Sequence, residues 1–322
     1  GVDVGGTSIK LGVISGAGKV VSETSLPTND EAGPVDAIQR INSRLTELVN
    51  GNKDQLVAAG LGTPGPLDTR RGMILNPVNM PGWRTFPVRD ELAKAVNLPV
   101  TYANDANAAA WGEYWIGTGK AYRSLVLLTL GTGVGGGIVT DDRMIVGSND
   151  NAAECGHTTV DFASDARTCS CGRSGHLEAY ASASAVALRA RELAKHQPES
   201  ELAARLNSAG DLTALDVYDC AERNDPAAWQ IIDQTAGWLA RGIANLAQTV
   251  DPDIFLLGGA MNFGGPTSDV GQRFLKTIED AVRPAVFDRI AENLTIAFAS
   301  LGGSAGWIGA AGLAKRVYDQ SK

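Results

Sequence analysis

The chain has 322 residues, 44% of them hydrophobic and 20% charged, with a formal net charge of −8 and a pI of about 5.0. This length exceeds the usual size of a single hydrophobic core and predicts two lobes. No basic patch is visible, which argues against a sequence-independent hold on nucleic acid or an anionic membrane. No stretch has the roughly 18–20 consecutive apolar residues of a transmembrane helix. We therefore expect a cytoplasmic protein with small-molecule partners. Because Gly1 already lies in a predicted strand, we also expect some residues upstream of it.

The predicted elements alternate between strands and helices along most of the chain. The first third predicts strands at 1–4, 9–14, up to about 26, 57–61 and 99–103, with helices at 34–49 and 88–96. The second part predicts strands at 125–130, 135–139, 254–257 and 294–299, mainly helices over 182–248, and a last helix at 304–318. A strand, a glycine turn with a threonine and a hairpin occur at 2–14 and again at 125–139, which predicts two related lobes facing each other.

Both glycine turns have the composition of phosphate-binding turns, because bare backbone N–H groups and a threonine hydroxyl can hold phosphate oxygens. A hairpin that needs positive φ would explain either turn alone. The pair favours a clamp on a triphosphate, with Asp3 holding Mg²⁺ directly or through water. The residues assigned to ATP and Mg²⁺ here are Asp3, Gly5, Gly6, Thr7 and Lys10 in the first turn and Gly131, Thr132 and Gly133 in the second.

Asp105 is the candidate catalytic base. It follows a predicted strand and opens an alanine-rich helix, with Asn104 placed to cap that helix. Caps of this type are commonplace, but a carboxylate in the first helical turn meets the positive end of the helix dipole, so we expect it to stay ionised at neutral pH. Such a group can accept the proton of a substrate hydroxyl during phosphoryl transfer.

A short glycine-rich loop gathers residues that ligate metals: His157, Cys169, Cys171 and His176. These four side chains suit tetrahedral zinc, and no ligand position is left open, so we expect the metal to be structural. Reduced thiols beside a surface histidine are the alternative. Cys155 and Cys220 are expected to be small apolar fillers.

Several motifs recur in the order found in one protein family. They are the first phosphate turn, 62–66, 79–83, Asn104-Asp105, 131–137, Glu154-x-Gly156-His157 and the cysteine loop that ends in Glu178. Together they resemble the ROK family (repressors, open reading frames and kinases), close to its bacterial glucokinases, over nearly the whole chain.

The resemblance implies an α/β, two-lobed, actin-like (ribonuclease H-like) ATPase fold with an interdomain cleft. Its small lobe would comprise 1–103 plus 311–322, and its large lobe 104–310. The implied sugar contacts are Gly65, Asn79, Asn104, Asp105, Glu154, His157 and Glu178, and Gly258 and Gly259 would line the adenosine site. A homodimer is also implied.

One position departs from the family pattern. The loop of the family usually supplies three cysteines, whereas His176 occupies the third place here. The inferred site changes from one histidine and three thiolates to two of each, which makes a Zn²⁺ site formally neutral instead of −1 and puts its affinity in doubt.

The expected activity is ATP-dependent phosphorylation of glucose to glucose 6-phosphate. The same machinery allows another sugar (N-acetylmannosamine, mannose, fructose or allose) or polyphosphate as the donor, and the sequence separates these poorly. A sugar-sensing repressor is the alternative from another class. Because the acidic chain shows no basic recognition helix, the sequence favours the kinase.

Overall fold

A computed structural model describes residues 1–77 and 79–322. Within these ranges the chain forms two compact units. Unit 1 comprises Gly1–Tyr122, Gly137–Ala153 and Ser300–Lys322, and unit 2 comprises Arg123–Gly136 and Glu154–Ala299. The chain therefore passes from one unit to the other after residues 122, 136, 153 and 299.

The first sheet has the strand order β3-β2-β1-β4-β7. Its strands are β1 (Val2–Val4), β2 (Ser8–Ile14), β3 (Val20–Pro27), β4 (Ala59–Thr63) and β7 (Val100–Asn104). β1, β2 and β3 form an antiparallel meander, whereas β4 and β7 run parallel to β1. A small hairpin, β5 (Leu67–Asp68) with β6 (Met73–Ile74), follows β4.

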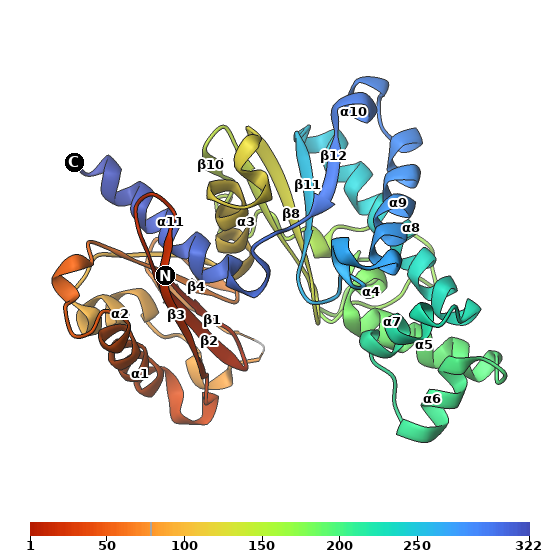
Figure 1. Ribbon diagram of the computed structural model, residues 1–322, viewed down its shortest axis with the longest axis horizontal. Coiled ribbons are helices and arrows are strands. Elements are labelled where there is room, and N and C mark those ends of the chain that lie inside the picture. Colours follow the sequence, from red (N-terminus) through yellow and green to blue (C-terminus); the bar gives the residue numbers. More distant parts are fainter. Residues whose placement is uncertain (78) are drawn as a thin grey trace. The chain divides into compact units, whose positions relative to one another are not determined.

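Alternation along β1 separates the core of unit 1 from its polar site. Val2 and Val4 are buried in the hydrophobic cluster that includes α1 (Gly33–Leu48) and α2 (Val88–Val96). Asp3, between them, points to the opposite face because successive side chains of a strand alternate. On that face lies α11 (Ala305–Gln320), and Figure 1 shows α1 and α2 on the other side of the sheet.

Two helices of unit 1 pack at backbone distance. A Cβ on Gly112 of α3 (Asp105–Trp115) would lie 2.6 Å from the carbonyl oxygen of Ala305, and a Cβ on Gly309 of α11 would collide with the carbonyl of Ala108. α3 therefore belongs with α11 in unit 1. The units differ here from the expected division into 1–103 plus 311–322 and 104–310, because this packing draws α3 and residues 300–310 together.

The second sheet has the order β10-β9-β8-β11-β12, which repeats the first: a hairpin followed by three further strands. Its strands are β8 (Ser124–Leu130), β9 (Val134–Thr140), β10 (Arg143–Met144), β11 (Ile254–Gly258) and β12 (Thr295–Phe298). β11 is parallel to both β8 and β12. The prediction of two related halves is confirmed by this shared order.

The remaining helices belong to unit 2. They are α4 (Glu178–Ala181), α5 (Ala183–His196), α6 (Glu201–Ala209), α7 (Ala214–Glu222), α8 (Pro226–Val250), α9 (Asp269–Val282) and α10 (Asp288–Asn293). α9 and α10 lie outside the helices that the sequence predicts. In the part of the chain that the structure describes, no helix combines the length and the apolar character that crossing a membrane requires.

Candidate functional site

In unit 1, Asp3 and Asp105 approach the same glycine. Gly62 of β4 stands opposite Asp3 of β1 and opposite Ala103 of β7. A Cβ on Gly62 would lie 3.7 Å from Oδ1 of Asp3 and 3.6 Å from Cα of Asp105. The absence of a side chain at Gly62 thus leaves room for the two acidic residues on either side of β4, Asp3 in β1 and Asp105 directly after β7.

Asp3 lies in surroundings that disfavour its charged form. Burial raises the pKa of Asp3 to about 7, the negative charge of Asp105 adds to the rise, and the positive charge of Lys10 opposes it. A Cβ on Gly306 of α11 would collide with the Asp3 carboxylate, so the helix backbone covers this group closely. A bound divalent cation would favour the ionised carboxylate and reverse the rise.

Asp105 is the first residue of α3, as predicted. Oδ1 of Asn104 caps the helix by accepting from the N–H groups of Ala106 (2.9 Å) and Asn107 (3.2 Å). Oδ1 of Asp105 also accepts from Ala106 N–H, at 2.7 Å. Burial outweighs the hydrogen bonds at this helix start: it raises the pKa of Asp105, and this effect is larger than the lowering by its hydrogen bonds.

The first glycine turn is held by its own strands and leaves its tip exposed. Gly5 N–H donates to the Ser8 carbonyl at 3.0 Å, and the Thr28 hydroxyl donates to the Gly5 carbonyl at 2.5 Å. Gly6 and Thr7 are exposed. Lys10 stands opposite Asp3 in the β1–β2 pair, and its Nζ donates to the Gly303 carbonyl at 2.9 Å.

Two further predicted sugar contacts lie beside residues already described. A Cβ on Gly65 would lie 3.8 Å from Nδ2 of Asn104. A Cβ on Gly6 would lie 3.2 Å from Cβ of Asn79, which places Asn79 against the first turn. In unit 1, a predicted sugar contact thus lies beside Asn104, and another lies beside the first glycine turn.

In unit 2, the second turn is held by the segment that follows the cysteine loop. Ala183 N–H donates to the Gly131 carbonyl at 2.8 Å, and the Ser184 hydroxyl donates to the Thr132 carbonyl at 2.9 Å. Gly131 N–H also donates to the Gly133 carbonyl at 3.0 Å, and Thr132 is exposed. Ser184 is not among the residues predicted from the sequence, although it lies in a serine-alanine stretch typical of a helix start.

The predicted adenosine residues lie at the end of β11, next to β8. Gly258 pairs with Thr129, and Gly259 has φ +90°. A Cβ on Gly259 would collide with the Leu130 carbonyl, immediately before the second turn. Only glycine accommodates both this backbone conformation and this close approach.

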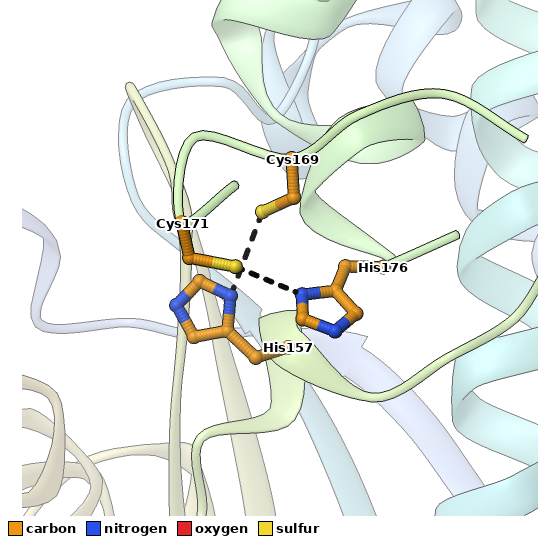
Figure 2. A group of neighbouring side chains, drawn as sticks. All are labelled: His157, Cys169, Cys171 and His176. Carbon is orange, nitrogen blue, oxygen red and sulfur yellow. Dashed lines mark hydrogen bonds between the residues drawn. The ribbon is translucent and has the colours of Figure 1, made fainter. Parts of the chain in front are cut away.

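The four predicted metal ligands converge, as Figure 2 shows. Their ligand atoms all lie within 4.8 Å of one another. Sγ of Cys169 is 3.6 Å from Nδ1 of His157, and Sγ of Cys171 is 3.3 Å from Nδ1 of His176. Tetrahedral zinc with Zn–S of about 2.3 Å and Zn–N of about 2.1 Å separates such atoms by about 3.6 Å. The donor set therefore fits a tetrahedral metal.

The backbone of the cysteine loop is arranged by turns that do not involve the ligand atoms. Cys169 N–H donates to the Arg173 carbonyl at 2.7 Å, and Gly172 N–H to the Cys169 carbonyl at 2.9 Å. Gly175 has φ +80°, and its Cα lies too close to the Asp161 carbonyl for a side chain. Cys155 and Cys220 are buried, as expected for apolar fillers, and burial raises the pKa of Cys155 to about 12.

Glu178 connects the cysteine loop to the second turn. Its Oε1 accepts from the Ser170 hydroxyl at 2.5 Å and from the Cys169 thiol at 3.4 Å. Its Oε2 accepts from Val134 N–H at 3.0 Å. Glu178, a predicted sugar contact, is therefore hydrogen-bonded both to the cysteine loop and to the residue that follows the second turn. Glu154, another predicted contact, is exposed, and His157 is half-buried.

Comparison with known proteins identifies the family. The model of the ROK family matches residues 1–317. The chain belongs to the ROK family. A glucokinase of Halalkalibacterium halodurans is 39% identical over 319 residues, which cover 98% of this chain and 94% of that protein. The structural similarity to ROK kinases confirms the predicted fold class of this chain, the actin-like two-lobed fold.

Two solved ROK structures are similar over almost their whole length. The ROK hexokinase from Thermus thermophilus has a TM-score of 0.82 and 31% identity, covering 99% of this chain and 98% of its own. A ROK glucokinase from Streptomyces griseus, solved with glucose and AMPPNP, has a TM-score of 0.78 and 33% identity, covering 98% of each chain.

Proposed function

We propose that this protein is a glucokinase that transfers the γ-phosphoryl group of ATP to the 6-hydroxyl of glucose. The observation that carries the proposal is the placement of Asp105 at the start of α3, beside Asp3, in a chain that matches ROK glucokinases from end to end. Phosphoryl transfer asks for a positioned carboxylate rather than a strong base, and Asp105 supplies one.

Asp105 is proposed to accept the proton of the attacking hydroxyl. The raised pKa that burial gives this carboxylate makes it a better proton acceptor than an exposed aspartate. Asn104 fixes its position, since the cap holds the first turn of α3 in place. The balance between burial and the hydrogen bond from Ala106 then sets how readily Asp105 takes the proton.

The two turns are proposed to bind the phosphates of ATP, each through backbone N–H groups and a threonine hydroxyl. Asp3 is the proposed Mg²⁺ residue, directly or through water, with Lys10 beside it. Mg²⁺, when bound, would neutralise charge on the phosphates. Gly258 and Gly259 are proposed to line the adenosine site, since the structure keeps this backbone bare next to the second turn.

The proposed sugar contacts are Gly65, Asn79, Asn104, Asp105, Glu154, His157 and Glu178. Carboxylates accept hydrogen bonds from adjacent hydroxyls, and an asparagine amide both accepts and donates them, which supports a hexose as the substrate.

The metal is proposed to be structural zinc held by His157, Cys169, Cys171 and His176. Zinc, when bound, would fix the cysteine loop and hold the ring of His157 in place for the sugar. The two thiolates balance the charge of the ion, so the site is formally neutral. The protein is also proposed to be cytoplasmic and to form a homodimer; light scattering on the purified protein tests the homodimer.

A coupled assay of ADP release over a panel of hexoses tests the function. We expect the highest kcat/KM with glucose and ATP. A higher value with N-acetylmannosamine, mannose, fructose or allose would reassign the sugar, and a higher rate with polyphosphate would reassign the donor. Sugar binding without turnover on any member of the panel would contradict the kinase and favour a sensor.

A further inference from the structure

Glu113 is a buried carboxylate that none of the motifs above includes. It lies on α3 and is 0% exposed. Its Oε1 accepts from the N–H groups of Ser300 (2.9 Å) and Leu301 (2.7 Å), and its Oε2 accepts from Thr118 N–H (3.0 Å) and the Ser300 hydroxyl (3.1 Å). A buried carboxylate costs several kcal/mol unless such bonds satisfy it.

The partners of Glu113 stand at two of the four places where the chain passes between the units. Thr118 begins the 3₁₀ turn Thr118–Ala121, which leads to the passage after residue 122. Ser300 is the first residue after the passage at 299. The Ser300 hydroxyl also accepts from Thr118 N–H at 3.0 Å, so the two segments are bonded to each other as well as to Glu113.

Backbone segments lie close around this carboxylate. A Cβ on Gly117 would collide with Oε2 of Glu113, so the segment that reaches Thr118 passes directly over the carboxylate. Gly112, the preceding residue of α3, packs against the backbone of α11 at Ala305. Glu113 thus sits where α3, the start of α11 and the turn at Thr118 meet.

Both ends of this arrangement lead to the acidic residues of unit 1. α3 begins with Asp105, eight residues before Glu113. The segment held at Ser300 and Leu301 leads into α11, whose Gly306 lies against the Asp3 carboxylate. If the segment at Ser300 and Leu301 moved along α3, α11 would move with it. The position of Asp3, which lies against α11, would then change relative to Asp105.

We propose that Glu113 is a positioning residue for phosphoryl transfer, holding the ends of two chain passages between the units against the helix that carries Asp105. The inference rests on the proposed role of Asp105 as the base. Reacting groups must be placed to within a fraction of an ångström, and a misplacement of about 1 Å can cost about 10²-fold in rate. A carboxylate serves here because it accepts from several N–H groups at once, whereas an amide presents an N–H₂ group to one side.

The test compares Glu113→Gln with the unchanged protein in steady-state kinetics and amide hydrogen exchange. We expect kcat to fall by about 10-fold or more, with each KM changed by less than about threefold, because binding groups stay in place while the reacting groups shift. Exchange should be faster at the amides of Thr118, Ser300 and Leu301, whose acceptor is weakened. An unchanged kcat or unchanged exchange at these amides would overturn the proposal.

Asp225→Asn is the matched control for loss of a buried carboxylate. Asp225 is 5% exposed and accepts from the N–H groups of Leu202 (3.0 Å) and Ala227 (2.9 Å), wholly within unit 2. We expect it to lower the melting temperature but to leave kcat within about twofold, since cap losses act on stability. A fall in kcat equal to that of Glu113→Gln would overturn the proposal, because general destabilisation would then explain both.

Two further variants keep the result interpretable. If Glu113→Gln does not fold, Ser300→Ala removes the hydroxyl that donates to Glu113 and accepts from Thr118 N–H. Because Thr118 N–H keeps Glu113 as an acceptor, the net loss is that of one hydrogen bond, about 0.5–1 kcal/mol, and kcat should fall about 2–5-fold; an unchanged kcat would overturn the proposal. Asp105→Asn distinguishes a failure of the positioning proposal from a failure of the proposed function. Should that variant stay active, the base assignment fails, and a loss confined to Glu113→Gln would support positioning of another base.

Discussion

The backbone N–H of Val134 donates a 3.0 Å hydrogen bond to Oε2 of Glu178 across 44 residues of sequence. Val134 directly follows the second glycine turn, and Glu178 is the last residue of the cysteine loop. The other oxygen of the same carboxylate accepts from Ser170 of that loop. The proposed sugar contact, the metal loop and the proposed phosphate turn are thus bonded in series inside unit 2.

Asp105→Asn should lower kcat by about 10²–10⁴-fold, because an amide cannot accept the proton of the sugar hydroxyl. Glucose binding, measured by calorimetry, should weaken but remain measurable. Asp36→Asn, a carboxylate on α1 paired with Arg40, serves as the control and should keep its activity. Retention of more than about a tenth of kcat in Asp105→Asn would mean that another group acts as the base.

His176→Ala should reduce the zinc content from about one ion per chain, since a tetrahedral site loses a ligand, whereas His176→Cys should retain it through a third thiolate. Elemental analysis of the purified protein measures both. His196→Ala is the control, because this exposed histidine lies at the end of α5 and is the one that the cluster does not use. Full zinc in His176→Ala would remove His176 from the ligand set.

Ser184→Ala should raise the KM for ATP about 2–10-fold, with little change in the KM for glucose. The hydroxyl of Ser184 holds the Thr132 carbonyl, and one such bond contributes about 0.5–1.5 kcal/mol. Ser208→Ala removes a similar hydroxyl, which donates to the Arg205 carbonyl on α6, and should change neither constant. If Ser184→Ala instead raises only the KM for glucose, the second turn does not hold the nucleotide.

Because the pKa of Asp3 is raised, the free energy of unfolding should depend on pH in protein dialysed free of Mg²⁺. Its folded pKa of about 7 lies above the ordinary value of 3.8, so the folded state binds the proton more tightly. The resulting stabilisation is fully present below about pH 4 and is lost as the pH rises through 7, by up to about 4 kcal/mol. Urea unfolding from pH 4 to 8 measures it. Asp3→Asn should show a shallower fall over this window, and an identical slope in both proteins would contradict the raised pKa.

Local sequence determined the elements and the motifs whose parts are close together in the chain. The strand-turn-hairpin pattern at 2–14 and 125–139 depends on glycine positions and alternation, which act over a few residues, and the structure has both sheets in the same order. The metal cluster was also predictable. Its four ligands lie within about twenty positions, and backbone turns between them fold the loop that brings the donor atoms together.

Only the tertiary structure decided what surrounds these motifs. In sequence, Glu113 is one acidic residue in an alanine-rich helix, typical of a solvated face, yet its partners at Ser300 and Leu301 come from 187 and 188 residues away and bury it. The same holds for Asp105: its helix start was predicted, but burial, not the helix end, determines the direction of its pKa shift. Desolvation depends on every neighbour that excludes water, and those neighbours are fixed only when the distant segments pack.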